Sequence, residues 1–166
     1  MKKFFVLLAA ISFAIGLTAC SAEKEAEPEK TKSEEASKPA VNPKSAMYKF
    51  YMSIVNTINE ADADLNAYEG AEEPTPEDKT AASESAAAVA SKVEGLEVPA
   101  ELKDQKSDLE AALKDLAESY KIKSEELKKD APSLEASDEK FAQAEEKIGA
   151  AFESVEMKKP SLAKEL

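Results

Sequence analysis

Residues 46–68, AMYKFYMSIVNTINEADADLNAY, are the part of the chain that decides its fold. Apolar residues recur in this stretch at alternating steps of four and three, the spacing of one face of an α-helix. Phe50 and Val55 widen the stripe into a band suited to face a core. The stretch predicts one unbroken amphipathic helix, with the seam residues Met47, Tyr51, Ile54, Ile58, Ala61, Leu65 and Tyr68.

Three further segments have apolar residues at helical spacing. Thr75 and Pro76 are typical of an N-cap and a first helical residue, and they predict a second helix that ends at Gly95. A third helix is expected from Pro99, which fits its first turn, to Leu127. Ser133 is placed to cap a fourth. Helices of about 20–32 residues joined by short loops predict an all-α, antiparallel up-down-up-down four-helix bundle, with elongated helical hairpins as the alternative.

The N-terminus has the organisation of a signal sequence. Lys2 and Lys3 precede an apolar run over residues 4–17, and Leu17-Thr18-Ala19-Cys20 follows with the only cysteine of the chain. This organisation resembles the lipobox of bacterial lipoproteins. A transmembrane helix is the first alternative, but no basic stop-transfer cluster follows the run. The second alternative is an ordinary secretory signal with a chance cysteine.

The lipoprotein resemblance implies a processing step and an anchor. It implies that a signal peptidase cuts between Ala19 and Cys20, and that the sulfur of Cys20 carries a diacylglyceryl group with palmitate-like chains. Two buried acyl chains give a lasting anchor, because each buried CH₂ contributes about 0.8 kcal/mol. The expected location is extracytoplasmic and membrane-anchored, with the outer membrane possible in a cell that has two membranes.

The residues after Cys20 divide into three parts. Residues 20–45 are rich in Glu, Lys, Ser, Ala and Pro, which predicts a disordered linker that lifts the domain off the membrane. Residues 46–157 are expected to form the helical domain, and residues 158–166 a flexible tail. The least stable helix should be the second, because its seam is mostly alanine and buries little apolar area.

Composition restricts the chemistry that the chain can perform. The sequence has no histidine, which removes Ser-His and Cys-His nucleophiles and imidazole metal sites. Removing residues 1–19 also removes two lysines, which takes the net charge from −12 to −14 and disfavours nucleic acid as a partner. The prediction is a protein that is not an enzyme and that carries no cofactor.

One set of acidic residues has the spacing of a calcium loop. Asp62, Asp64, Asn66 and Glu73 match four ligand positions of an EF-hand, but Ala67 replaces the glycine that the turn requires. The helical seam also continues through this segment. We therefore expect solvated acids on a helix rather than a metal site, and no stabilisation by calcium.

Two classes of function remain for the mature domain. The first is a non-catalytic interaction or structural module, whose acidic surface meets an envelope protein with a basic or apolar surface. The second is a binding protein for a small ligand or cation within the bundle. A cavity between helices would favour the second class, and a fully packed core with an exposed apolar groove would favour the first.

Overall fold

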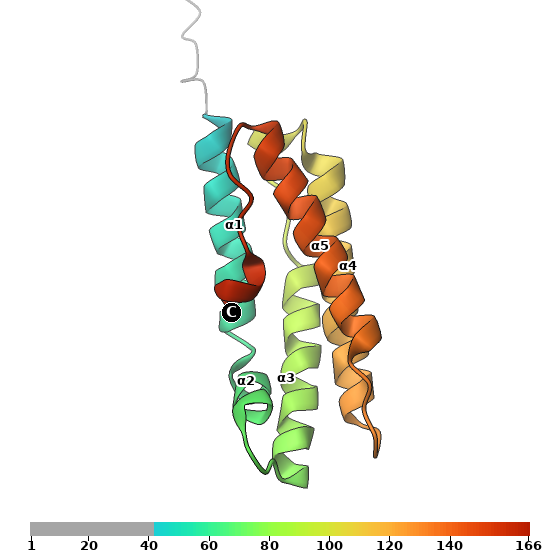
Figure 1. The fold of residues 1–166 in the computed structure, drawn as a ribbon. Coiled ribbons are helices and arrows are strands. Elements are labelled where there is room, and N and C mark those ends of the chain that lie inside the picture. Colours follow the sequence, from blue (N-terminus) through green and yellow to red (C-terminus); the bar gives the residue numbers. More distant parts are fainter. Residues whose placement is uncertain (1–41) are drawn as a thin grey trace, which may run out of the picture. The chain divides into compact units, whose positions relative to one another are not determined.

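The computed structural model describes residues 42–166, and this part of the chain is all-α. The α1–α2 arm, α3, α4 and α5 run alternately in opposite directions (Figure 1). The prediction of an all-α helical bundle is therefore confirmed. The elements are α1 (Pro43–Asn59), α2 (Ala63–Gly70), α3 (Pro76–Glu94), the 3-10 helix η1 (Ala100–Leu102), α4 (Lys106–Leu127), α5 (Glu135–Ser154) and the 3-10 helix η2 (Leu162–Lys164).

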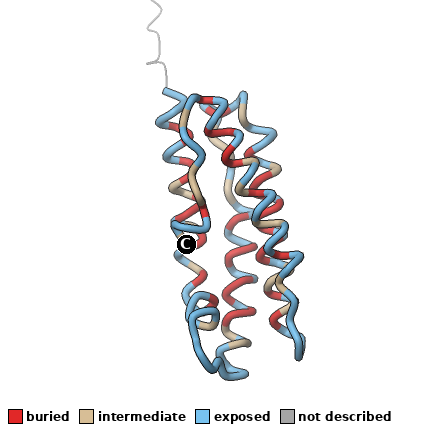
Figure 2. Tube along the Cα trace, in the orientation of Figure 1, coloured by how far each residue is buried: buried red, intermediate tan, exposed pale blue. Residues whose placement is uncertain are grey.

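The core is built from the predicted apolar seams. Figure 2 shows the buried residues as stripes along the helices. Met47, Ile54 and Ile58 from α1 are at most 1% exposed, so the first seam faces inward as expected. The rings of Tyr51 and Phe152 meet edge to face with centroids 5.4 Å apart, which packs α1 against α5.

The first predicted helix is broken between α1 and α2, so the prediction of an unbroken helix was wrong there. The backbone N–H groups of Ala61 and Asp62 both donate to the carbonyl of Ile58, at 2.9 and 3.1 Å, which closes the end of α1. The Ser85 hydroxyl of α3 donates to the carbonyl of Ala61 at 2.6 Å. Ser85 thereby satisfies an acceptor that a continuous helix would have used internally.

Of the three later helix starts that the sequence predicted, the start of α3 is confirmed and the other two differ from the prediction. Thr75 caps α3 as predicted: its side chain accepts from the Asp78 N–H, and its own N–H donates to the Asp78 carboxylate. The segment after Pro99 forms only η1 before α4 begins. Ser133 does not cap α5, because its N–H donates to Glu126 Oε2 at 3.1 Å and Leu134 occupies the cap position.

The N-terminal boundary of the domain lies earlier than expected. The Asn42 side chain accepts from the Lys44 N–H at 3.0 Å, and Pro43 is the first residue of α1. The last residues assigned to the linker therefore belong to the bundle, because Asn and Pro here act as a cap and a first helical residue. The predicted signal peptide, Cys20 and the linker up to residue 41 lie outside the described residues.

The C-terminal segment differs from the flexible tail expected at residues 158–166. Glu156 adopts a positive φ of 56°, which turns the chain back along α1 (Figure 1). Leu162 is then completely buried, and the Asn59 side chain donates to the carbonyl of Glu165 at 3.2 Å. A few apolar residues in a Lys-rich segment give no periodic signal, but the burial of Leu162 and the partial burial of Leu166 pack the segment against the bundle.

Gly149 permits this packing. A Cβ atom added to Gly149 would lie 3.0 Å from the Cδ atom of Lys159, closer than nearly all such contacts. The aliphatic stem of Lys159 thus passes directly over the backbone of α5.

Candidate ligand pocket

A pocket of about 390 Å³ lies among α2, α4, α5 and the C-terminal segment. Its buried lining consists of Asp62, Leu65, Ser119 and Tyr120, and half-buried and exposed residues form the rest. This volume is near the lower end of the range for small-ligand sites. The pocket can therefore hold a small molecule rather than a large cofactor.

Acidic groups dominate the charged lining of the pocket. Two carboxylates come from Asp62, which precedes α2, and Glu69, which lies in it. Two more come from Asp138 and Glu145 of α5. The only ammonium group in the lining is that of Lys123. Lys123 Nζ donates to Glu69 Oε1 at 2.8 Å, so these two charges offset each other. The pocket retains an excess of negative charge.

Lys123 lies among the apolar residues of α4 with its stem buried. Its side chain is only 17% exposed, and its ammonium lies 5.9 Å from the centre of the Tyr120 ring. The stem is buried while the charge reaches Glu69, as expected for a lysine on an apolar face. Lys106, the other lysine on this seam, is 55% exposed and is not held in the same way.

Asp62 is the most buried carboxylate of the pocket, with 4% of its surface exposed. Burial raises the pKa of this carboxyl, hydrogen bonds from the Asn66 side chain and from its own backbone N–H oppose the rise, and Glu69 adds to it. The charged form of Asp62 is thus poorly solvated in this structure. A cation in the pocket would favour the ionised carboxylate.

Two buried side-chain oxygens in and beside the pocket have no hydrogen-bond partner within residues 42–166. The first is Glu145 Oε1, which lacks a donor. The Tyr120 side chain also lines the pocket and is 5% exposed, and burial and the nearby carboxylates of Asp62 and Glu69 raise its pKa. The second unpartnered oxygen is the Tyr51 hydroxyl. Its pKa is raised by burial and by Glu165 and Glu145.

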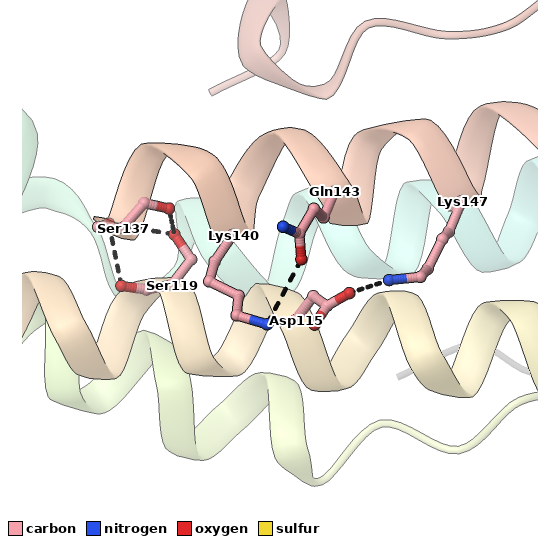
Figure 3. A network of polar contacts seen from close by, with 6 residues as sticks. All are labelled: Asp115, Ser119, Ser137, Lys140, Gln143 and Lys147. Carbon is pink, nitrogen blue, oxygen red and sulfur yellow. Dashed lines mark hydrogen bonds and ion pairs between the residues drawn. The ribbon is translucent and has the colours of Figure 1, made fainter. Parts of the chain in front are cut away.

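A reciprocal pair of serines fixes α4 to α5 at the edge of the pocket. Ser119 Oγ donates to the carbonyl of Ser137 at 2.8 Å, and Ser137 Oγ donates to the carbonyl of Ser119 at 3.0 Å (Figure 3). Both side chains are almost fully buried. This arrangement satisfies the hydroxyl groups without a ligand and sets the distance between the two helices that flank the pocket.

One turn earlier on α4, Asp115 lies between two lysines of α5. Lys140 Nζ donates to Asp115 Oδ1 at 3.1 Å, and Lys147 Nζ pairs with Asp115 Oδ2 (Figure 3). The hydrogen bond from Lys147 and then that from Lys140 lower the pKa of Asp115 against the opposing effect of burial. The group does not line the pocket and contributes to the packing of α4 on α5.

The residues with calcium-loop spacing do not converge. Asp62 and Asn66 line the pocket, while Asp64 and Glu73 are exposed and lie away from it. The segment between Asp62 and Gly70 is helix α2, in which residues two positions apart, such as Asp62 and Asp64, point to different sides. In residues 42–166 no three acidic groups come together in a way that could hold a metal ion.

Sequence reasoning missed most of the pocket. The sequence singled out Asp62 and Asn66 only as possible metal ligands. Glu145 follows the core residue Ala144, and Tyr120 lies among the apolar core residues of α4. The sequence pattern therefore did not indicate that either residue lines a pocket. The spacing of Asp62, Asn66 and Glu69 along one helical face was the only available hint.

The lipidation residues Ala19 and Cys20 lie outside the described residues. In the part that the structure does describe, no helix has both the length and the hydropathy needed to cross a membrane. No protein-family model, curated protein or solved structure matches the chain.

Proposed function

We propose that this chain is an extracytoplasmic lipoprotein, anchored through a diacylglyceryl group on Cys20, whose helical domain is a non-catalytic module that binds a small ligand. The Leu17–Cys20 motif supports the anchor. The observation that supports the binding role is the pocket of about 390 Å³ between α2, α4 and α5. Residues 21–41 separate Cys20 from the start of the domain and act as its tether.

The surface of the domain favours the pocket over an apolar docking groove. In residues 42–166 Tyr48 is the only large hydrophobic side chain that is exposed, at 55%. A single exposed aromatic residue is common on soluble proteins and does not indicate an interface. The pocket combines an enclosed floor with polar groups that have no partner, which is the usual organisation of a ligand site.

The anchor is tested by replacing Cys20 with alanine, with Ser21→Ala as the matched control. Cells are grown with labelled palmitate, and acylation of the chain is measured. We expect the label to be lost in Cys20→Ala and retained in Ser21→Ala, because only a thiol can form the thioether. A wild-type chain that is never labelled, in a cell that acylates its other lipoproteins, would contradict the proposal.

The binding role is tested by filling the pocket. Ala142 lines the pocket from an exposed position on α5, and Ala150 is an exposed alanine of the same helix outside it. Small cations, neutral molecules and anions are screened by their effect on the melting temperature of the full chain in detergent. A true ligand should stabilise the wild type and Ala150→Trp, but not Ala142→Trp. At 100 times its dissociation constant it adds about 2.7 kcal/mol.

The second candidate function is the display of an acidic surface to an envelope protein. The net charge of −14 after processing favours a partner with a basic or apolar surface. Association would slow as salt rises, since the Debye length falls from about 10 Å at 0.1 M to about 3 Å at 1 M. Deleting residues 23–40 should weaken capture at the membrane without changing affinity in solution. If capture of the partner depends on neither the salt concentration nor residues 23–40, this function is excluded.

A further inference from the structure

We propose that the ligand of the pocket is a small organic cation that carries N–H donors and a short apolar chain, as in an alkylamine or a polyamine. This inference rests on the proposed binding function and names the chemical class of the ligand. Three features of the described residues lead to it: the charge of the lining, its unpartnered polar groups and its apolar wall.

The charge of the lining selects a cation. Lys123 offsets Glu69, but Asp62, Asp138 and Glu145 form no ion pair within residues 42–166. Their charges therefore act together on whatever enters the pocket. Because Asp62 is buried, its attraction to a cation is stronger than that of a carboxylate on the open surface. The same carboxylates would repel an anionic ligand.

The unpartnered groups require a ligand that can donate hydrogen bonds. Glu145 Oε1 is a buried acceptor without a donor, and such an atom costs free energy until it is satisfied. Tyr120 also lines the pocket, and a phenolic oxygen can accept a hydrogen bond from a ligand. An ammonium group supplies several N–H donors together with its charge, and charge-assisted hydrogen bonds are the stronger kind.

Part of the lining is apolar and suits a hydrocarbon chain. Leu65 is buried in the floor, and Phe141 and Leu166 are half-buried residues of the wall. The carboxylates come from different elements around this apolar surface and form no three-ligand cluster within the described residues. An elongated organic cation satisfies both parts of the lining, whereas a compact metal ion uses only the acids.

The experiment measures binding of defined probes to the full chain in detergent by calorimetry. The probes are spermidine, n-butylamine, tetramethylammonium, 1-butanol and sodium butyrate. We expect the two amines to bind and tetramethylammonium to bind more weakly, because it has no N–H group. Sodium butyrate and 1-butanol should not bind.

Two pairs of isosteric variants locate the site. Glu145→Gln and Asp62→Asn should each raise the dissociation constant for spermidine about tenfold, which corresponds to about 1.4 kcal/mol. The matched controls Glu146→Gln and Asp64→Asn change exposed carboxylates on the same two helices outside the pocket and should change it less than about twofold. Glu145→Gln alone decides the matter if the Asp62 variant does not fold.

The other outcomes contradict the inference, and they distinguish failure of the ligand class from failure of the binding function. Binding of butyrate or butanol, lost in Ala142→Trp, with no binding of amines would refute the ligand class and leave the binding function in place. Amine binding that Glu146→Gln weakens as much as Glu145→Gln would be general attraction to an acidic surface and would refute the site. If only a lysine-rich protein binds and no free probe does, both the inference and the small-ligand function fail. The same conclusion follows if nothing binds.

Discussion

The two halves of α4 differ although both pack between α3 and α5. The first half buries an apolar face made of Leu109, Leu113 and Leu116, with Asp115 beside it. The second half buries Leu127 together with Ser119 and Tyr120, and it holds the lysine of the pocket, Lys123. Apolar burial stabilises a bundle without selecting a ligand, whereas buried polar groups cost free energy unless they are satisfied. The first half thus contributes mainly apolar packing, and the α4 residues of the proposed binding role lie in the second half.

The largest expected effect is the truncation of a core leucine. Leu113→Ala in the apolar half, and Leu65→Ala at the pocket floor, should each lower the free energy of unfolding by about 2–5 kcal/mol, because both side chains are nearly fully buried. Urea unfolding followed by circular dichroism measures the change. Glu72→Ala, an exposed loop residue, is the control and should change stability by less than about 0.5 kcal/mol. Equal tolerance at all three positions would contradict the packing.

The serine pair should show the next largest effect. Ser119→Ala or Ser137→Ala alone should cost about 1–1.5 kcal/mol, because each removes a buried hydrogen bond between α4 and α5. The two losses should not be independent, since the hydroxyl groups also lie 3.2 Å from each other. A double-mutant cycle by urea unfolding measures the coupling. Strictly additive losses would mean that the two bonds form independently.

Local signals predicted much of the fold. The seams of the four predicted segments face the core, and the capping box of Thr75 and Asp78 forms where Thr75-Pro76 predicted the start of α3. These features depend on neighbours in the sequence, within a few residues. They are therefore visible before any tertiary contact is known.

The features that were missed depend on distant contacts. The break after α1 is stabilised by the Ser85 hydroxyl, and the C-terminal segment packs mainly through Leu162, which is fully buried. Likewise, Glu145 and Tyr120 become pocket residues only because α2 and the C-terminal segment meet α4 and α5. A polar residue beside an apolar seam has the same sequence pattern whether it meets solvent or a pocket.

The ion pairs of Asp115 should contribute less than the serine pair, because both lysines are more than one-third exposed. Asp115→Asn should cost about 1 kcal/mol at neutral pH. Lys147, and then Lys140, lower the pKa of this carboxyl in the folded protein, so the unfolded chain binds the proton more readily. Stability from Asp115 is thus complete above the pKa of the unfolded chain, about 3.9, and is lost as pH falls through the lower folded value.

Urea unfolding between neutral and acidic pH measures this contribution. Wild type should lose it as pH falls below about 4, and Asp115→Asn should not. Asp108→Asn, which removes an exposed carboxylate from the first turn of α4, is the control for a general acid effect. The assignment fails if the wild type and Asp115→Asn have parallel pH profiles.

The smallest effect on stability, and the sharpest test of the comparison, is expected for Tyr120→Phe. Tyr120 lines the pocket and its hydroxyl is assigned to the ligand, so without ligand the free energy of unfolding should change by less than about 0.5 kcal/mol. Tyr51→Phe is a matched control, because the Tyr51 hydroxyl is buried without a partner in the described residues and Tyr51 does not line the pocket. Only Tyr120→Phe should weaken the binding of spermidine, measured by calorimetry. A loss of more than about 1 kcal/mol in Tyr120→Phe, with unchanged binding, would mean that its hydroxyl is a structural group. In that case the polar half of α4 would serve packing, as its apolar half does.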